Sequence, residues 1–429
     1  MSRIRTRHLA SCAAILLVAA CAANGPRASS STAAPVPAVG SSSAAPSSDP
    51  WADDLTLLDN KVRAMHPGPF VVTPEAVWMA KLDELRMTLP TATPDERVVQ
   101  FASLVGLLDT HSSMSGHFHY YDALFYRFAD GWFVVRAKDR TLVGSRLVAI
   151  GDHPVSDVEA ALRPLVPADN ESGELDGLQY PMSTVEFLHG IGIVDDPAKP
   201  NYVLQRPDGT TTTVDLTSSE PVEFWETQLG VIGGLVGDAP EAVARRGQSA
   251  WTRLDKSTKT FILSYNDYSE EGLKQPLAAM KAALDDGSAT RVIVDMRYIR
   301  GGIGNLAQPL IDALTGDPRI NRSDKLTVLI GRENVSAGTV VAAKLDTQTK
   351  AVLIGEMTPA RADNFLCDCF DIVLPNSGLT VTVPTQRAGT GDPRLAVEPD
   401  IPFALKAADF FAGRDPALEL ALKGGSTAP

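Results

Sequence analysis

The stretch Arg291-Val292-Ile293-Val294-Asp295-Met296-Arg297-Tyr298-Ile299-Arg300-Gly301-Gly302 decides the fold of this chain. An apolar, β-branched run ends there in a charged loop and a glycine pair, which is typical of a buried strand that leads into a turn. Three similar runs occupy residues 260–265, 326–331 and 351–355, and segments with helical spacing lie between them. Strands that alternate with helices predict a mostly parallel sheet with both faces covered. We therefore expect an α/β domain over residues 251–429.

Two regions with other patterns precede this domain. Residues 117–250 carry short strand-like runs separated by turn residues, which predicts a small β-rich region. Within it, residues 144–155 resemble the second half of a PDZ domain, where a strand, a turn and a helix follow one another. Asp208-Gly209 lies between two further strand-like runs and predicts a hairpin.

Residues 51–116 have apolar side chains at spacings of three and four, which predicts helices packed in a small bundle. His66-Pro67-Gly68-Pro69 ends the first helix. Thr73, followed by a proline, is the expected N-cap of the second helix, and the third is expected to start near Thr93-Pro94.

The N-terminus has the features of an export signal over residues 1–20. Three arginines precede a short apolar stretch that ends in small residues and is far shorter than the ~20 apolar residues of a membrane span. Val18-Ala19-Ala20-Cys21 resembles a bacterial lipobox, so Cys21 is the expected site of lipid attachment; the alternative is an ordinary secretory signal with a chance cysteine. Residues 21–50 are mostly Ala, Ser, Pro and Gly, which predicts a flexible tether. We expect an exported protein, lipid-anchored on the extracytoplasmic side of a bacterial membrane.

The formal net charge is −13, and removal of the three arginines of the signal takes it to −16. An acidic balance excludes the basic footprint of a nucleic-acid-binding protein and argues against electrostatic binding to anionic lipid. Apart from Cys21, only Cys367 and Cys369 remain after processing, and the sequence leaves open whether they are bridged. His117 and His119 alternate, but no third ligand presents itself, so we expect no metal and no cofactor.

Two loops after predicted strands carry the residue types of a hydrolytic site, and function in such sheets collects in these loops. Ser336 follows one strand and starts a helix, where unpaired N–H groups and a positive potential lie close to its hydroxyl. Gly301-Gly302 follows another strand and allows a second backbone to approach closely. These are the parts of a nucleophile and an oxyanion hole. The residues alone equally allow a serine that only caps the helix.

Six short motifs are similar to those of one family of serine peptidases. They are Leu108-Asp109-Thr110-His111-Ser112, similar to L-x-D-G-H-T; residues 295–302, similar to D-L-R-x-N-x-G-G; Ser336-Ala337-Gly338, similar to S-[AS]-[SAG]-E; and residues 355–358, 374–378 and 398–402. Through their number and order, the chain resembles the tail-specific protease, C-terminal processing peptidase and tricorn-core group, with its interphotoreceptor-retinoid-binding-like fold. The resemblance implies a helical N-terminal bundle, a small PDZ-like β-rich middle and a ClpP/crotonase-like α/β catalytic domain.

The resemblance also implies roles for single residues. Ser336 would attack a peptide carbonyl to give an acyl-enzyme. The N–H groups of Ala337 and of Gly301 or Gly302 would form the oxyanion hole. A peptide or protein substrate is therefore expected.

The general base departs from the commonest pattern of the family. Many members use a lysine where this chain has Arg361, and a guanidinium does not deprotonate in proteins. The family's other base is a histidine at the position of His111, whose ordinary pKa suits this task near neutral pH. An ordinary buried histidine at a helix end is the alternative. Glu398 is a candidate for orienting the base.

Together with the missing lysine, two further departures from the family pattern leave room for a second hypothesis. Tyr298-Ile299-Arg300 replaces an Asn-centred run, and Thr339 replaces an acidic residue. The first hypothesis is a serine-type peptidase. The alternative is an inactive relative that binds a peptide or an apolar ligand in the same cleft.

Overall fold

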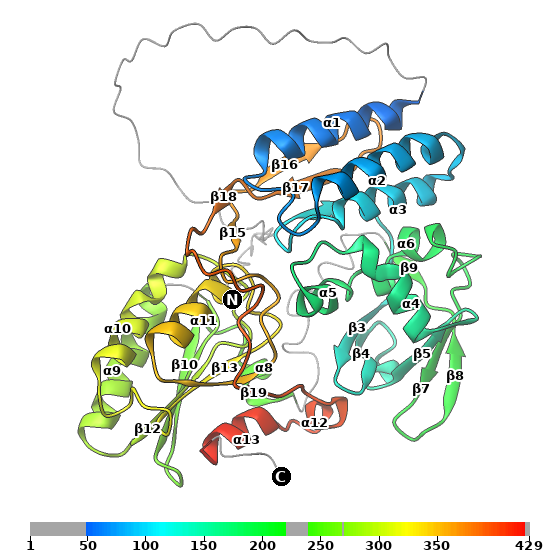
Figure 1. The fold of residues 1–429 in the computed structure, drawn as a ribbon. Helices are drawn as coiled ribbons and strands as arrows, with labels where there is room; N and C mark the ends of the chain where they lie inside the picture. Colours follow the sequence, from blue (N-terminus) through cyan, green and yellow to red (C-terminus); the bar gives the residue numbers. More distant parts are fainter. Residues whose placement is uncertain (1–48, 220–238, 268–269, 425–429) are drawn as a thin grey trace, which may run out of the picture. The chain divides into compact units, whose positions relative to one another are not determined.

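The computed structural model describes residues 49–219, 239–267 and 270–424 (Figure 1). Residues 47–429 form one compact unit. The expected signal, Cys21 and all but the last two residues of the expected tether lie outside the described residues. Within the described ranges, no helix is both long enough and apolar enough to cross a membrane.

Three helices begin the described chain and confirm the predicted helical region (blue to cyan in Figure 1). They are α1 (Pro50–Met65), α2 (Glu75–Thr88) and α3 (Pro94–Val105), with the short η1 (Leu89–Thr91) between the last two. Thr93 caps α3, since its hydroxyl accepts the N–H of Glu96 and the Glu96 carboxylate accepts the N–H of Thr93. The N-cap prediction for α2 is wrong. Pro74 takes the cap position there, one residue after Thr73, and no side chain caps the helix.

The middle of the chain forms an antiparallel sheet in the strand order β3-β4-β5-β7-β8, with β6 paired to β5. The strand, turn and helix expected over residues 144–155 are present as β5, the turn at residues 151–152 and the start of α4, with the short strand β6 between turn and helix, and the predicted hairpin joins β7 to β8. The elements are β2 (Tyr120–Tyr121), β3 (Ala123–Phe128), β4 (Gly131–Ala137), η2 (Arg140–Leu142), β5 (Arg146–Ile150), β6 (His153–Pro154), α4 (Val155–Leu162), η3 (Arg163–Leu165), α5 (Glu171–Gly177), η4 (Pro181–Ser183), α6 (Val185–Gly190), β7 (Tyr202–Gln205), β8 (Thr211–Val214) and β9 (Ser218–Ser219).

The C-terminal part contains the predicted sheet, in the order β10-β11-β12-β13-β14-β19. All neighbouring pairs from β11 onward are parallel, and only β10 is antiparallel to its neighbour. The elements are α8 (Glu241–Ala244), β10 (Ala250–Asp255), β11 (Thr260–Tyr265), α9 (Glu270–Asp285), β12 (Arg291–Asp295), η5 (Gly304–Ala307), α10 (Gln308–Gly316), β13 (Leu326–Ile330), α11 (Ala337–Gln348), β14 (Val352–Gly355), β19 (Ile401–Pro402), α12 (Ala407–Phe411) and α13 (Pro416–Leu422).

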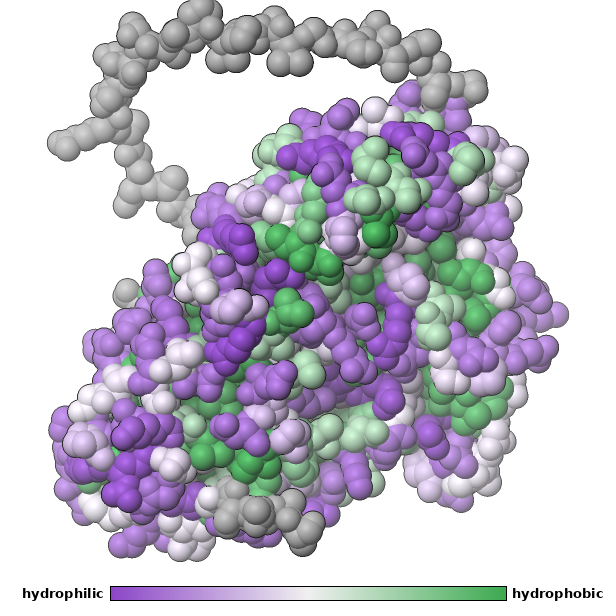
Figure 2. All heavy atoms as spheres, in the orientation of Figure 1, coloured by the Kyte–Doolittle hydropathy of each residue, from purple (hydrophilic) through white to green (hydrophobic). Residues whose placement is uncertain are grey.

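Alternation along the strands covers both faces of this sheet. Val292 and Val294 of β12 point to the core shared with α9, α10 and α11, whereas Ile293 points to the core shared with α8 and α13. Both cores are apolar, which confirms a mostly parallel sheet with covered faces. The face drawn in Figure 2 is largely hydrophilic, and its hydrophobic residues form separate small groups.

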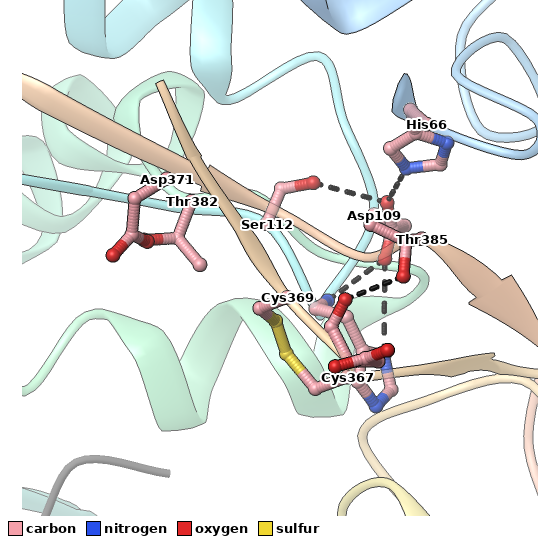
Figure 3. Close-up of a disulfide and its surroundings, with 10 residues drawn as sticks. His66, Asp109, Ser112, Cys367, Cys369, Asp371, Thr382 and Thr385 are labelled. Carbon is pink, nitrogen blue, oxygen red and sulfur yellow. Dashed lines mark hydrogen bonds and ion pairs between the residues drawn. A yellow bond between two sulfur atoms is a disulfide. The ribbon is translucent and has the colours of Figure 1, made fainter. Parts of the chain in front are cut away.

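A small antiparallel sheet joins the end of the helical region to the C-terminal part. Its order is β1-β17-β16, so residues just after His111 pair with residues far along the chain. A disulfide between Cys367 and Cys369 lies between β15 and β16 (Figure 3), which answers the question that the sequence left open. The elements are β1 (Ser113–Ser115), β15 (Phe365–Leu366), β16 (Phe370–Val373), β17 (Thr380–Val383) and β18 (Gln386–Arg387).

Candidate active site

Ser336 occupies a sharp turn between β13 and α11 and has an unusual backbone conformation. Its φ of 57° and ψ of −126° lie in a region that residues with a side chain rarely adopt. It stands at the N-cap position, but its side chain makes no capping hydrogen bond with α11. A strained strand-to-helix turn that presents a serine hydroxyl is how α/β-hydrolases hold their nucleophile. Strain without a capping bond therefore favours a functional role over the capping alternative.

Buried polar side chains hold this turn in place. Asn334 is fully buried; its Oδ1 accepts the N–H of Gly331 at 2.8 Å, and its Nδ2 donates to the carbonyl of Met296. The hydroxyl of Thr339 donates back to the carbonyl of Asn334. Thr339 therefore has a structural use at the position where the resembling family has an acidic residue.

Gly301, the first residue of the glycine pair, lies directly against Ser336. A Cβ on Gly301 would stand 3.0 Å from the Cβ of Ser336 and 3.5 Å from its Oγ. Gly301 and Gly302 have φ values of 131° and 122°, which only glycine adopts without strain. Their N–H groups donate to no other residue in the described ranges. The structure thus brings together Gly301, one part of the predicted oxyanion hole, and Ser336, the predicted nucleophile.

Arg300, one of the departures from the family pattern, ties the glycine loop to its surroundings. Its guanidinium lies 2.8 Å from Asp176 of α5 and 3.3 Å from Glu333, three residues before Ser336. The buried Glu333 also pairs with Arg246 at 2.6 Å. These ion pairs connect the loop that carries Gly301 with the loop that carries Ser336.

His111 lies in the turn after α3, and its side chain is only 5% exposed. Neither ring nitrogen has a hydrogen-bond partner among the described residues, and Nδ1 lies 3.8 Å from Oδ1 of Asp109. Burial lowers the pKa of His111 more than the carboxylates of Asp109 and Asp169 raise it. The imidazole is therefore neutral at neutral pH and able to accept a proton.

Asp109 is buried, and Figure 3 shows the ring of His66 and the hydroxyl of Ser112 directed at its carboxylate. His66 Nε2 lies 2.6 Å from its Oδ2, the hydroxyl of Ser112 donates to Oδ2 at 3.1 Å, and the N–H of His111 donates to Oδ1 at 2.8 Å. Burial alone would raise the pKa of Asp109, but the hydrogen bond from His66 and the nearby histidines hold it below its ordinary value. Asp109 is therefore an ionised carboxylate beside the candidate base.

Arg361 pairs with a second carboxylate near His111. Its Nε lies 2.9 Å from Oδ1 of Asp169, and its N–H donates to Oδ2 of the same residue at 3.2 Å. Thr110 links the two segments, since its hydroxyl donates to the carbonyl of Pro359 and accepts the N–H of Asp169. Arg361 is therefore part of an ion pair that flanks the histidine.

The segment after β14 contacts both the serine turn and the histidine turn. Asn364 Nδ2 donates to the carbonyl oxygen of Ser336 at 2.8 Å. The ring of its neighbour Phe365 packs edge-on against the ring of His66, with 4.8 Å between the centroids. This segment therefore connects the serine turn with His66 and, through the hydrogen bond from Thr110 to Pro359, with the turn that carries His111.

Sequence reasoning missed His66, Asp169 and Asn364 as parts of this site. Their partners lie far away in sequence, from 28 residues for Asn364 and Ser336 to 192 for Asp169 and Arg361. Glu398 is exposed and makes no hydrogen bond or ion pair with another described residue, so its orienting role stays a prediction. No group of three metal-binding side chains occurs in the part of the chain that the structure describes.

Comparisons with known proteins identify a similar fold. No protein-family model and no curated protein matches the sequence. The fold is nevertheless shared with a solved structure: mature CPAF complexed with lactacystin matches with a TM-score of 0.60 at 16% identity, over 87% of this chain and 97% of CPAF. Two weaker matches are also found. The photosystem II D1 C-terminal processing protease matches with a TM-score of 0.33 at 14% identity, over 85% of this chain and 98% of that chain. A putative S41 protease from Bacteroides fragilis matches with a TM-score of 0.33 at 13% identity, over 74% of this chain and 87% of that chain. At these identities the likeness to CPAF shows the fold alone.

Proposed function

We propose that this chain is a serine-type peptidase that hydrolyses peptide bonds through an acyl-enzyme. The observation that carries the proposal is the strained, non-capping Ser336 at a strand-to-helix turn, with Gly301 packed against it. A nucleophile on a rigid turn, with backbone N–H groups beside it, is the arrangement that acyl transfer requires. The likeness of the fold to CPAF supports the same reading.

In the proposed reaction, neutral His111 removes the proton of the Ser336 hydroxyl while the oxygen attacks the substrate carbonyl. The N–H groups of Ala337 and of Gly301 or Gly302 stabilise the negative charge on the carbonyl oxygen. The C–N bond then breaks, and the leaving amine takes the proton from His111. A water molecule, deprotonated by His111, releases the acid product and regenerates Ser336.

His111 does not hydrogen-bond to Ser336. Hydrogen bonds between catalytic groups are often long without substrate and tighten in the substrate complex. The proposal therefore requires His111 and Ser336 to meet when a peptide is bound.

The location of the reaction is part of the proposal. We propose that Cys21 is acylated and that the enzyme works at the extracytoplasmic surface of a bacterial membrane. The disulfide between Cys367 and Cys369 supports an oxidising compartment. A tether of about thirty residues would give the folded part a reach of roughly 30 Å. In cells, Cys21→Ala should move the protein from the membrane fraction to the soluble fraction, and unchanged membrane association would contradict the anchor.

A serine-directed fluorophosphonate tests the activity. Wild-type chain should be labelled on the peptide that contains Ser336, and Ser336→Ala should not be labelled. Ser257→Ala is a matched control, because Ser257 is exposed and precedes β11, at the opposite end of the parallel strands from Ser336. Absence of Ser336-dependent labelling would favour the inactive, ligand-binding relative.

A further inference from the structure

We infer that Asp109, oriented by His66, is the positioning residue that holds His111 for catalysis. The inference rests on the proposed function and adds to it two residues that neither sequence motif nor fold likeness assigned. His66 follows the end of α1, and Asp109 lies in the turn after α3. Both residues that position the proposed base His111 would therefore belong to the helical region. The carboxylate stands between two imidazoles.

Hydrogen bonds assign the proton on His66. The N–H of Gly68 donates to Nδ1 of His66 at 3.0 Å, so Nδ1 is an acceptor and carries no proton. Nε2 therefore carries the proton and donates it to Oδ2 of Asp109 at 2.6 Å. His66 serves Asp109 as a neutral donor. The ring is fully buried and packed against Phe365, which leaves it no room to turn.

The second oxygen of Asp109 faces His111. Oδ1 already accepts the backbone N–H of His111 at 2.8 Å, and it lies 3.8 Å from the ring nitrogen Nδ1. A closer approach of about 1 Å would make a normal hydrogen bond. When His111 takes the serine proton, its Nδ1–H would have this carboxylate as its nearest acceptor, and the negative charge would stabilise the imidazolium.

The other charged groups that face His111 do not offer the same support. Asp169 approaches from the loop before α5, but Arg361 already neutralises it. Within the described ranges, the groups that contact Asp109 are neutral donors, from His66, Ser112 and the backbone. Neutral donors do not cancel the negative charge of a buried carboxylate, so this charge can stabilise a neighbouring group that becomes positive. That group is His111.

A purely architectural role is the competing explanation, in which the His66–Asp109 pair only fastens α1 to the turn after α3. The two explanations differ in what a substitution does to the folded protein. An architectural pair affects the unfolding temperature alone. A positioning pair affects the rate at which Ser336 is acylated and the pH at which that rate falls.

The experiment measures the rate of fluorophosphonate labelling of Ser336 against pH, together with the unfolding temperature, in the full chain. Asp109→Asn should slow labelling by up to about 10⁴-fold, the loss that the comparable substitution causes in a serine-protease triad. It should also move the acidic limb of the profile to lower pH, because the carboxylate that raises the pKa of His111 is gone. His66→Phe should slow labelling about tenfold or more, because it removes a hydrogen bond to a charged group. His66→Gln retains a donor toward Asp109 and should label within about threefold of the wild type.

His189→Phe is the matched control, because it removes another His–Asp contact of 2.6 Å, to Asp95. It should leave the labelling rate unchanged. Equal rates for His66→Phe and His66→Gln, or an Asp109→Asn profile with an unshifted acidic limb, would overturn the inference. If the wild type is not labelled at all, the proposed function fails. NMR titration of the His111 ring then decides the inference alone: a lower pKa in Asp109→Asn upholds it and an unchanged pKa overturns it.

Discussion

The side-chain amide of Asn364 donates a hydrogen bond to the carbonyl oxygen of Ser336 at 2.8 Å. That carbonyl belongs to the same planar peptide unit as the N–H of Ala337, the proposed oxyanion donor. The bond therefore fixes the direction in which this N–H points, besides holding the strained backbone of Ser336.

Asn364→Leu should misdirect the proposed oxyanion donor while leaving the hydroxyl of Ser336 in place. Loss of one such donor typically costs about 10² to 10³-fold in rate, and a misdirected donor should cost about tenfold or more. Single-turnover labelling of Ser336 measures it. Asn321→Leu is the control, because Asn321 accepts a backbone N–H from Lys350, after the C-terminal end of α11. Equal labelling of the two variants would contradict the role of Asn364.

Gly301→Ala should abolish labelling and destabilise the fold. The new methyl group would meet the Cβ of Ser336 at 3.0 Å in a backbone conformation that alanine adopts only with strain of about 1–3 kcal/mol. Gly287→Ala separates the two effects, because Gly287 has a positive φ of 74° but no neighbour within 4 Å of a Cβ. It should lower the unfolding temperature and retain the labelling rate. Normal labelling of Gly301→Ala would contradict the claim that the reactivity of Ser336 requires its close contact with Gly301.

Arg300 should be energetically coupled to Asp176 in the labelling rate. Each single substitution by alanine loosens the link between the glycine loop and α5, and the second adds little once the first has been made. A double-mutant cycle on the labelling rate measures this coupling, and we expect single effects of about tenfold. Strictly multiplicative effects would show that the ion pair does not position the loop.

Asp169 should make stability depend on pH. Burial, and then the neighbouring charge of Asp109, raise its pKa above the ordinary value despite the opposing effect of Arg361. A carboxyl group that binds its proton more tightly in the folded chain costs stability as pH rises from its unfolded pKa through its folded pKa. Arg361→Gln removes the opposing cation, so its free energy of unfolding should fall more steeply than that of the wild type as pH rises above about 4, the ordinary pKa of an aspartate. Chemical denaturation across this range measures it, and parallel curves would contradict the pairing.

Local patterns predicted most of the fold. The strand over residues 291–295, the helix start at Ser336 and the hairpin at Asp208-Gly209 each depend on neighbours within a few residues. The cap of α2 was misassigned because Thr73 and Pro74 are both acceptable before a helix, and one residue separates the two readings. Ser336 could be placed at a helix start, whereas its φ of 57° depends on tertiary packing.

The supporting residues of the site could not be predicted from the sequence. His66 is 43 residues away from Asp109, and Asp169 is 192 residues away from Arg361. Only the fold brings these side chains together, and neither His66 nor Asp169 belongs to a recognisable motif. Arg361 stood out in sequence because it replaces a lysine, but its use as the partner of Asp169 appears only in the structure.

The most direct test of the central claim is the trapping of the acyl-enzyme. An activated peptide ester is mixed with the chain, the reaction is quenched within the first turnover, and the mass of each peptide is measured. We expect a burst of one leaving group per chain and an acyl adduct on the peptide that contains Ser336, both absent in Ser336→Ala and strongly slowed in His111→Asn. Hydrolysis without an adduct, or an equal burst from Ser336→Ala, would contradict the account.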